Sequence, residues 1–217
     1  MISVIIPVWN GENYLAEAVN SVNRQNSDTE IIVVDDGSTD NTAKLAKSFG
    51  CRIVSIPHKG SSVARNVGLT VANGDTIMFL DHDDVLTEGS LDRLDKSLIS
   101  GIDFVSAKVR DFLSPELSNS EKYKLVPRKK AYGGLLTGAY LFRQSVFVTV
   151  GGFNERLMTG ECIDLLFRCS DLKLKELRLD FISAHRRLHL FNKGRIMRTQ
   201  ENKDYSAILR EKIKKGE

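Results

Sequence analysis

The 217-residue sequence predicts an α/β fold in which a mostly parallel sheet is flanked by helices. Apolar runs of strand length recur along the first half of the chain, and each of the first three is followed by a segment whose apolar residues have helical spacing. The connections are short, which is typical of strand–helix–strand units. Strands are expected at residues 3–8, 30–34, 52–56 and 76–80, and helices at residues 13–24, before Gly50, and at residues 61–72.

The apolar side chains of these helices predict which faces pack on the sheet. Residues at i, i+3, i+4 and i+7 fall on one side of a helix and form a stripe that can be buried. Glycines, which readily end a helix, follow the second and third helices. The side chains expected to face inward are Leu15, Ala18, Val19 and Val22 in the first helix, Ala43, Ala46 and Phe49 in the second, and Val63, Val67 and Val71 in the third.

The second half of the chain is less regular. A helix is expected at 88–99, with Leu91, Leu94 and Leu98 inward, then a strand at 103–109, an apolar segment at 134–142, an edge strand at 173–179 and a basic, weakly amphipathic helix at 201–215. Residues 112–130 show no periodicity and contain two prolines, so a long loop is expected there. Its basic side chains could bind an anionic acceptor, but the simpler interpretation is that they belong to a solvated loop. These side chains are Lys122, Lys124, Arg128, Lys129 and Lys130.

The composition fits a globular domain and narrows the classes of function. Hydrophobic residues make up 41% and charged residues 27%, enough to build a core. A net charge of +3 is too small to indicate nucleic acid as a partner. The three cysteines have neither metal-site spacing nor a disulfide pattern, so a reducing, cytoplasmic location is expected. No signal peptide is expected, because the first residues have the pattern of a core strand and lack a basic n-region. No membrane-spanning helix is expected either, because no apolar run approaches the roughly 20 residues that one needs.

Clustered acids follow the strand expected at residues 76–80. Asp81, Asp83 and Asp84 lie close in sequence, and like charges so near one another resist ionisation unless a cation neutralises them. Oxygen ligands at i and i+2 suit Mg²⁺ or Mn²⁺, which could hold a diphosphate. A solvated acidic turn is the alternative interpretation of the same residues.

Polar residues also follow the other three strands. They are Pro7-Val8-Trp9-Asn10, Asp35-Asp36-Gly37 and His58-Lys59-Gly60. Each could be an ordinary turn, and Asp-Gly in particular is a common turn pair. Since the carboxyl ends of parallel strands meet at one edge, together they predict a nucleotide pocket with a metal at its mouth.

Several motifs resemble those of the family 2 glycosyltransferases with the GT-A fold, in order and in spacing. They are Ser3–Asn10, Val33–Thr42, Gly60–Gly68 and Phe79–Asp84 on one side, and Thr137–Arg143, Val150–Glu155, Gly160–Arg168 and Arg187–Asn192 on the other. The resemblance implies a GT-A type, Rossmann-like sheet. It also implies transfer of a sugar, with inversion, from a nucleotide diphosphate, with a UDP-sugar as the expected donor and Mn or Mg as cofactor. The expected division is a donor-binding half at 1–110, an acceptor-side half at 111–200, and a basic tail at 201–217.

The resemblance also assigns site residues. Those expected to bind the nucleotide sugar are Pro7, Val8, Glu12, Asp36, Arg65, Asp81, His82 and Asp83. Those expected to bind the metal are the Asp81/Asp83 pair and His189, which would approach from the opposite side. The metal would stabilise the leaving diphosphate as a Lewis acid. Without the flanking Arg187 and Asn192, His189 would be interpreted as an ordinary surface histidine.

One position departs from the family pattern. The motif usually carries an Asp directly after a Glu, and that Asp is the general base that takes the proton of the acceptor hydroxyl. This chain has Cys162 there, and a thiol of ordinary pKa is a poor base. Cys162 also fits as a small core residue. The candidates for catalysis are therefore Glu161, Cys162 and Asp164, with Glu161 preferred because it starts the helix.

Two classes of function remain open from the sequence. The first is an active, metal-dependent inverting glycosyltransferase, and the second is a nucleotide-sugar-binding homologue that has lost its base. An unrelated nucleotidyltransferase is less favoured because it would not need the motifs around Glu161 and His189. The expected acceptor is a glycan or glycolipid of polysaccharide biosynthesis. The basic tail has two interpretations: packing on the domain, which is preferred, and a weak contact with the inner face of a membrane.

Overall fold

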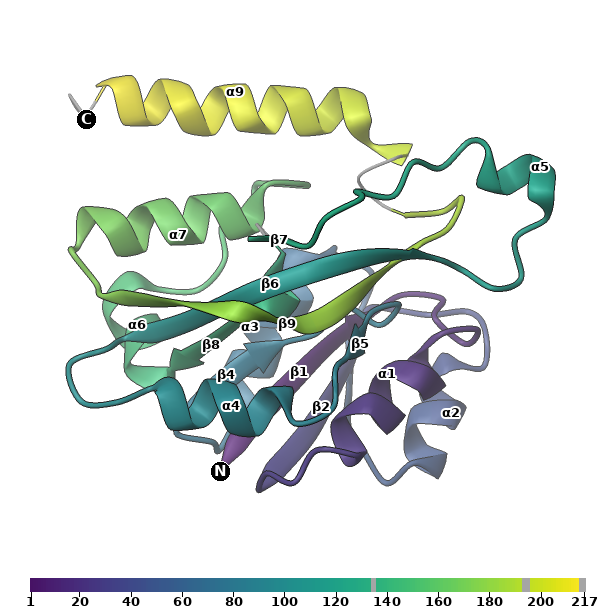
Figure 1. Cartoon of the computed structure of the whole chain (residues 1–217), viewed down its shortest axis with the longest axis horizontal. Coiled ribbons are helices and arrows are strands. Elements are labelled where there is room, and N and C mark those ends of the chain that lie inside the picture. Colours follow the sequence, from purple (N-terminus) through teal and green to yellow (C-terminus); the bar gives the residue numbers. More distant parts are fainter. Residues whose placement is uncertain (134–135, 193–195, 215–217) are drawn as a thin grey trace.

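The computed structural model describes residues 1–133, 136–192 and 196–214, and within these ranges the strands form one nine-stranded sheet (Figure 1). The strand order is β3-β2-β1-β4-β8-β6-β9-β5, and β7 pairs with β6. Residues 134–135 of the expected apolar segment and residues 215–217 of the expected tail lie outside the described ranges.

The first half of the sheet is the predicted parallel unit. Its strands are β1 (Ile2–Val8), β2 (Thr29–Asp35), β3 (Arg52–Ser55) and β4 (Thr76–Phe79), connected by α1 (Leu15–Asn23), α2 (Thr42–Ser48) and α3 (Ser61–Val71). β1 pairs in parallel with β2 and β4, and β2 pairs in parallel with β3. The carboxyl ends of these strands therefore lie at one edge, as the sequence predicted.

The second half of the sheet is mixed. It contains β5 (Val85–Leu86), β6 (Phe104–Leu113), β7 (Tyr132–Gly133), β8 (Tyr140–Arg143) and β9 (Glu176–Leu188). β8 runs antiparallel to β4 and β6, whereas β6 and β9 are parallel. The edge strand expected at 173–179 is the first part of the longer strand β9, where residues 176–178 pair with β6 alone. The prediction was wrong in length, because β9 continues to Leu188 and pairs with β5 only at Ala184 and His185.

The remaining helices are α4 (Ser90–Ser97), α5 (Asn119–Lys122), the 3₁₀ turn η1 (Thr137–Ala139), α6 (Gln144–Val150), α7 (Glu161–Asp171) and α9 (Arg198–Lys214). α9 runs along α7 (Figure 1), and Asp204 accepts hydrogen bonds of 2.9 Å from the backbone and hydroxyl of Thr159, just before α7. The C-terminal helix thus packs on the domain. The expected loop at 112–130 is partly ordered, since β6 continues to Leu113 and a Ser118–Glu121 capping box starts α5.

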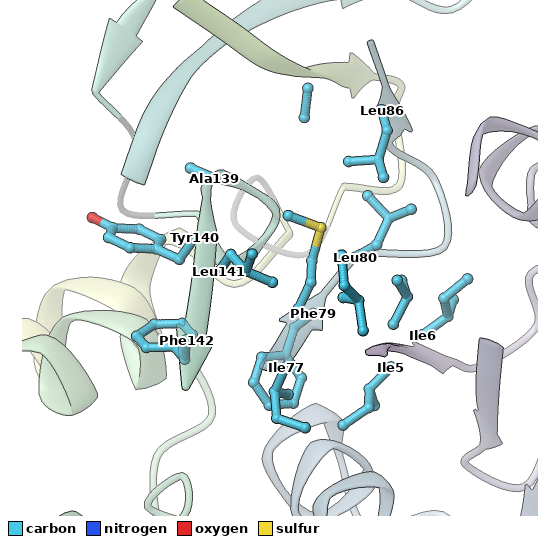
Figure 2. Close-up of a cluster of buried hydrophobic side chains, with 14 of the residues drawn as sticks. Ile5, Ile6, Ile77, Phe79, Leu80, Leu86, Ala139, Tyr140, Leu141 and Phe142 are labelled. Carbon is cyan, nitrogen blue, oxygen red and sulfur yellow. The ribbon is translucent and has the colours of Figure 1, made fainter. Parts of the chain in front are cut away.

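The core lies where the parallel and mixed halves meet. Side chains of β1, β4 and the β8 region fill this layer, among them Ile5, Phe79 and Leu141 (Figure 2). The predicted inward residues of α1 and α4 are all buried. In α2, Ala46 is buried, whereas Ala43 and Phe49 are half-buried.

The face predicted for α3 was right in part. Val67 and Val71 pack against the core, but the three predicted valines are only half-buried, and the buried residues are Ser62, Ala64, Arg65 and Gly68. A Cβ on Gly68 would lie 2.4 Å from Cγ2 of Ile5, so this helix approaches β1 through its smallest residues. Among the described residues, no helix is both long and apolar enough to cross a membrane.

Candidate functional site

The polar strand ends predicted to converge do converge. The register of β1 against β2 pairs Val8 with Asp35, and the Asp36 backbone N–H donates to the Val8 carbonyl over 2.8 Å. Leu80 N–H donates in the same way to Ile5, at 3.0 Å, so the turn that begins at Asp81 starts at the same edge. Pro7 and Val8 are buried at this edge beneath the loops that follow them.

Asp36 organises the loop after β3. One of its carboxylate oxygens accepts from the Lys59 N–H at 2.7 Å, and the other accepts from the Gly60 N–H at 2.8 Å. His58 Nδ1 lies 2.9 Å from the second oxygen. The His58 ring stacks on Trp9 with ring centroids 4.5 Å apart, and Trp9 is 51% exposed. A half-exposed aromatic face therefore lies beside a buried carboxylate, an arrangement suited to a planar heterocycle.

Glu12 has a structural partner in the loop before α2. Its carboxylate accepts from both the backbone and side-chain nitrogens of Asn41, each at 2.9 Å. The Glu12 N–H in turn donates to Asp40 at 3.1 Å. Burial would raise the pKa of Asp40, but hydrogen bonds from Thr42 and Glu12 lower it. These contacts join the loops after β1 and β2, and the expected contact of Glu12 with a base stays a prediction.

Arg65 connects two distant acidic residues. Its guanidinium is 2.7 Å from Asp81 Oδ1 and 2.7 Å from Glu161 Oε1, and only 5% of its side chain is exposed. Burial alone would lower the pKa of Arg65, but the carboxylates of Asp81 and Glu161 outweigh it and raise that pKa. Arg65 is therefore a fixed positive charge between the end of β4 and the start of α7.

Asp83 and His189 meet across the site, although 106 residues separate them in sequence. His189 Nε2 lies 2.9 Å from Asp83 Oδ2, and the Asn192 amide donates to the same oxygen at 3.2 Å. Asn192 also accepts from the His189 N–H, which fixes the turn. Burial would raise the pKa of Asp83, but the hydrogen bond from His189 and the charges of His82 and His189 lower it.

The turn after β4 is tied to the end of β9 by Arg187. Its Nε donates to the Asp83 carbonyl at 2.9 Å, its backbone N–H donates to Asp84, and a terminal nitrogen pairs with Glu17 at 2.6 Å. Burial, together with the charges of Asp83 and Asp81, raises the pKa of Asp84 well above its usual value. The sequence placed Asp84 in the acidic cluster but gave it no role of its own, and it gave no signal for Glu17. Arg187 is almost completely buried, and its role at the site becomes clear only from the three residues that it contacts.

His82, between the two aspartates, packs against the loop after β1. A Cβ on Gly11 would lie 2.6 Å from Cδ2 of His82, so this contact requires a glycine at position 11. The half-buried imidazole therefore occupies the same edge as Val8 and the loop after β1. Its expected contact with a bound ligand stays a prediction.

Two donors of the expected metal set lie together. The Asp83 carboxylate and the His189 imidazole are ligand types that Mn²⁺ accepts, and they face one another. Asp81, the third expected ligand, is held by Arg65. Within the described ranges, no three His, Cys, Asp or Glu side chains form a group that could hold a metal by themselves. The donor set thus suits a cation whose remaining ligands come from a bound molecule.

The three candidates at the start of α7 have different surroundings. Glu161 faces Arg65. Cys162 is only 6% exposed, and burial raises the pKa of its thiol strongly, an effect that nearby Arg65 only partly offsets. Asp164 pairs with Arg168 at 2.9 Å, and Arg168 donates to the carbonyls of Val150 and Gly152. Glu161 therefore lies on the strand-end side, while Asp164 anchors the turn after α6.

Two cavities lie away from the strand ends. A cavity of about 280 Å³ lies between β6, β9 and Tyr140, and another of about 350 Å³ lies between α3 and α6. Neither is lined by Asp36, Asp83 or His189. We place the functional site at the strand ends because the charged groups described above converge there.

Comparison with known proteins agrees with this geometry. A family model described as Glycosyl transferase family 2 matches residues 3–157. An uncharacterised glycosyltransferase of Rickettsia conorii is 33% identical over 189 residues, which cover 77% of this chain. The chain spans 31% of the length of that relative.

Solved structures share the fold. S. aureus TarS 1–349 in complex with UDP-GlcNAc superposes with a TM-score of 0.72 at 21% identity, covering 88% of this chain and 60% of the TarS 1–349 chain. The mannosyltransferase PcManGT from Pyrobaculum calidifontis, in complex with GDP-Man and Mn²⁺, superposes with a TM-score of 0.74 at 15% identity, covering 98% of this chain and 64% of PcManGT. At these identities the likeness establishes the architecture of the sheet.

Proposed function

The chain belongs to the family 2 glycosyl transferases, with a GT-A fold, and on that premise we propose that it transfers a sugar from a nucleotide diphosphate, expected to be UDP, to an acceptor hydroxyl. The observation that carries this proposal is the double ion pair of Arg65, which brings Glu161 to the same side as Asp81 and the Asp83–His189 pair. A carboxylate and a candidate diphosphate site thus face one another across a fixed positive charge.

We assign the nucleoside to the edge formed by β1 and β2. Pro7 and Val8 form its floor, Asp36 offers a buried carboxylate to a base N–H, and the exposed face of Trp9 offers a stacking surface. Both oxygens of Asp36 already accept loop hydrogen bonds, but a carboxylate has about four acceptor positions. Glu12 and His82 lie on the loops around this edge.

The diphosphate belongs beside Arg65 and Asp83 in this proposal. Asp83 and His189 would hold Mn or Mg, with Asp81 as the third ligand if it leaves Arg65 when donor binds. When bound, the metal supplies Lewis-acid stabilisation to the leaving diphosphate. The Mn²⁺ in the PcManGT complex supports a divalent ion. His189 lies in the part of the chain assigned to the acceptor, so the donor site draws residues from both expected halves.

Glu161 is the base we assign. The acceptor oxygen forms a bond to the anomeric carbon, and its proton passes to the Glu161 carboxylate. The bond between that carbon and the diphosphate oxygen breaks, and the nucleoside diphosphate leaves with the electron pair. Attack from the face opposite the leaving group inverts the anomeric centre. Arg65 orients Glu161 through their ion pair of 2.7 Å. General-base catalysis typically contributes about 10² to 10⁴-fold.

A second candidate function is a nucleotide-sugar-binding protein without transfer activity. The observation in its favour is Cys162, a buried, neutral thiol at the position of the usual base. We prefer the enzyme because a carboxylate next to Cys162 already faces the strand ends.

The acceptor we propose for the transferred sugar is a glycan or glycolipid.

The test is a panel of UDP-sugars and GDP-mannose, each with Mn²⁺ or with a chelator. A donor at about 100 times its dissociation constant should stabilise the fold by roughly 2.7 kcal/mol. Release of UDP that depends on both metal and an added acceptor would support transfer. Stabilisation without release from any donor and acceptor would favour the binding protein, and no stabilisation by any nucleotide would contradict both.

A further inference from the structure

A basic loop, residues 115–130, extends from the end of β6 and carries α5 (Figure 1). It is anchored close to the proposed site. Ser114, just before it, donates from its backbone N–H to the Leu188 carbonyl at 3.0 Å and receives a hydrogen bond from Arg187. Glu116 accepts a hydrogen bond from the Tyr14 hydroxyl, and the Tyr14 ring lies 4.8 Å from that of His189.

The basic loop carries an excess of positive charge. It contains five basic and two acidic side chains, a net charge of +3. Lys124, Arg128, Lys129 and Lys130 are exposed. Such a concentration at one projecting segment creates a local positive potential that attracts anionic surfaces.

The same loop exposes two large apolar side chains. Tyr123 is 89% exposed and Val126 is 87% exposed. Neighbouring Leu117 and Leu125 are buried, at 8% exposure each, so the loop has a packed inner side and an apolar outer side. The Ser118–Glu121 capping box and a hydrogen bond of 2.9 Å from Arg128 N–H to Asp111 hold this arrangement. Tyr123 and Val126 therefore point outward from a folded segment.

We propose that the basic loop docks the protein on an anionic lipid surface, with Tyr123 and Val126 entering the headgroup region and the basic side chains contacting lipid phosphates. A soluble polyanion would explain the basic side chains, but it would offer no apolar environment for Tyr123 and Val126. A membrane interface satisfies both, because aromatic and aliphatic groups insert there while Lys and Arg contact anionic headgroups. This docking surface differs from the C-terminal helix, whose Asp204 and Ile208 pack on the domain.

Docking through this loop would bring the strand-end rim to the membrane. Glu116 of the loop contacts Tyr14, and Ser114, directly before the loop, contacts Leu188 and Arg187, so a glycolipid acceptor would reach the site without leaving the surface. The inference does not depend on sugar transfer, since vesicle binding is measured without nucleotide.

The experiment is co-sedimentation of the full chain with vesicles of phosphatidylcholine alone or mixed with phosphatidylglycerol. We expect binding to the mixed vesicles, weakened by salt. Each lysine at an anionic surface accounts for about a fivefold change in partitioning, so Lys129→Gln/Lys130→Gln should weaken binding about thirtyfold. Tyr123→Ser/Val126→Ser should weaken it about tenfold or more through lost apolar burial.

Matched controls separate this surface from general charge and hydrophobicity. Lys44→Gln/Lys47→Gln removes two exposed lysines of α2, and Val148→Ser removes an α6 valine that is 85% exposed. Both controls should bind the mixed vesicles like the parent chain. Melting curves verify that every variant is folded.

Several outcomes would overturn the proposal. One is failure of the parent chain to bind the mixed vesicles. Another is equal binding by the loop variants and the controls, which would move any contact to another surface such as α9. A third is tight binding to soluble polyphosphate that Tyr123→Ser/Val126→Ser leaves unchanged while vesicle binding is absent, which would assign the loop to an anionic polymer.

Discussion

Two acidic segments meet at Arg65, and they are built differently. In the turn after β4, Asp81 pairs with Arg65, Asp83 contacts His189, and Asp84 accepts from Arg187, so each carboxylate is held by a different element. At the start of α7, Glu161 alone of the three candidates contacts Arg65. Cys162 is buried in the core, and Asp164 pairs with Arg168.

The difference shows that the two segments can change independently. The turn after β4 depends on partners from α1, α3 and β9, and substituting one of its residues would disturb several contacts. The start of α7 needs only one carboxylate toward Arg65, and the next position can become part of the core. A thiol at position 162 is therefore compatible with the contacts of Arg65 and of the turn after β4, and we propose that the proton passes to Glu161 instead.

The largest effect is expected from Glu161→Gln. Removing the proposed base while keeping the shape of the side chain should lower turnover about 10² to 10⁴-fold. Donor affinity should change little. Asp164→Asn is the matched control, because it removes a carboxylate from the same helix that pairs with Arg168 instead. Steady-state kinetics and donor titrations measure both. Equal turnover of the two variants would contradict the claim that Glu161, and not Asp164, is the base.

Next in size is the effect of the Asp83–His189 pair on metal-dependent binding. Asp83→Asn and His189→Gln should each remove the gain in UDP affinity that Mn²⁺ gives the parent chain, because each replaces one of the two donors that face one another. The fold should persist, as judged by circular dichroism. Calorimetric titrations with Mn²⁺ and with a chelator make the comparison. A parent chain that binds UDP equally well in both conditions would contradict the assignment.

A moderate effect is expected at the nucleoside edge. Trp9→Ala should weaken nucleotide binding by about 1–3 kcal/mol through lost stacking, and Asp36→Ala by a similar amount through an unpaired base N–H. Asp36→Ala should also loosen residues 58–60, which donate to its carboxylate. Hydrogen exchange of Lys59 and Gly60 separates that structural effect from the loss of binding. Parent-like affinity in both variants would move the pocket elsewhere.

The smallest effect concerns pH. Burial raises the pKa of Cys162, and it raises the pKa of Cys169 to about 11, so both thiols stay neutral in the folded chain at pH values where an unfolded chain ionises them. The unfolded state then binds fewer protons, and stability falls as pH rises above about 8.5. The loss should reach about 1–2 kcal/mol per thiol near pH 10.

Denaturant titrations at several pH values measure this slope. The Cys162→Ala/Cys169→Ala variant should lose less stability between pH 8 and about 10 than the parent chain does. The comparison uses slopes, so a constant loss from the smaller side chains does not affect it. Equal slopes would show that the two thiols are not buried as the structure has them.

The parallel half of the fold could be predicted from the sequence because its signals are local. Apolar runs mark β1, β2 and β4, and the parallel topology then brings Val8, Asp36 and Asp81 to one edge. The helix faces were predictable where large aliphatic residues repeat, as in α1 and α4. The prediction for α3 was right only in part, because Gly68 packs closely on Ile5 and the small residues of the helix take the most buried positions, while its valines are half-buried.

Parts of the site had no local signal. The Asp83–His189 contact could be expected only from the family resemblance, since 106 residues lie between the two side chains. Arg187 belonged to a recognised motif, yet its pair with Glu17 spans 170 residues and depends on how β9 enters the sheet. Glu161 and Asp164 are three residues apart, and only the neighbouring Arg65 and Arg168 show that they serve different purposes.

The central claim is that Glu161 has replaced the residue at position 162 as the base, and the turnover of Cys162→Asp tests it most directly. The variant should bind donor like the parent chain but show no gain in turnover, because Glu161 already takes the proton. Stability should fall, since a carboxylate at this buried position adds a charge to the core. A rise in turnover of about 10²-fold or more at unchanged donor affinity would contradict the claim and show that the parent chain lacks a base.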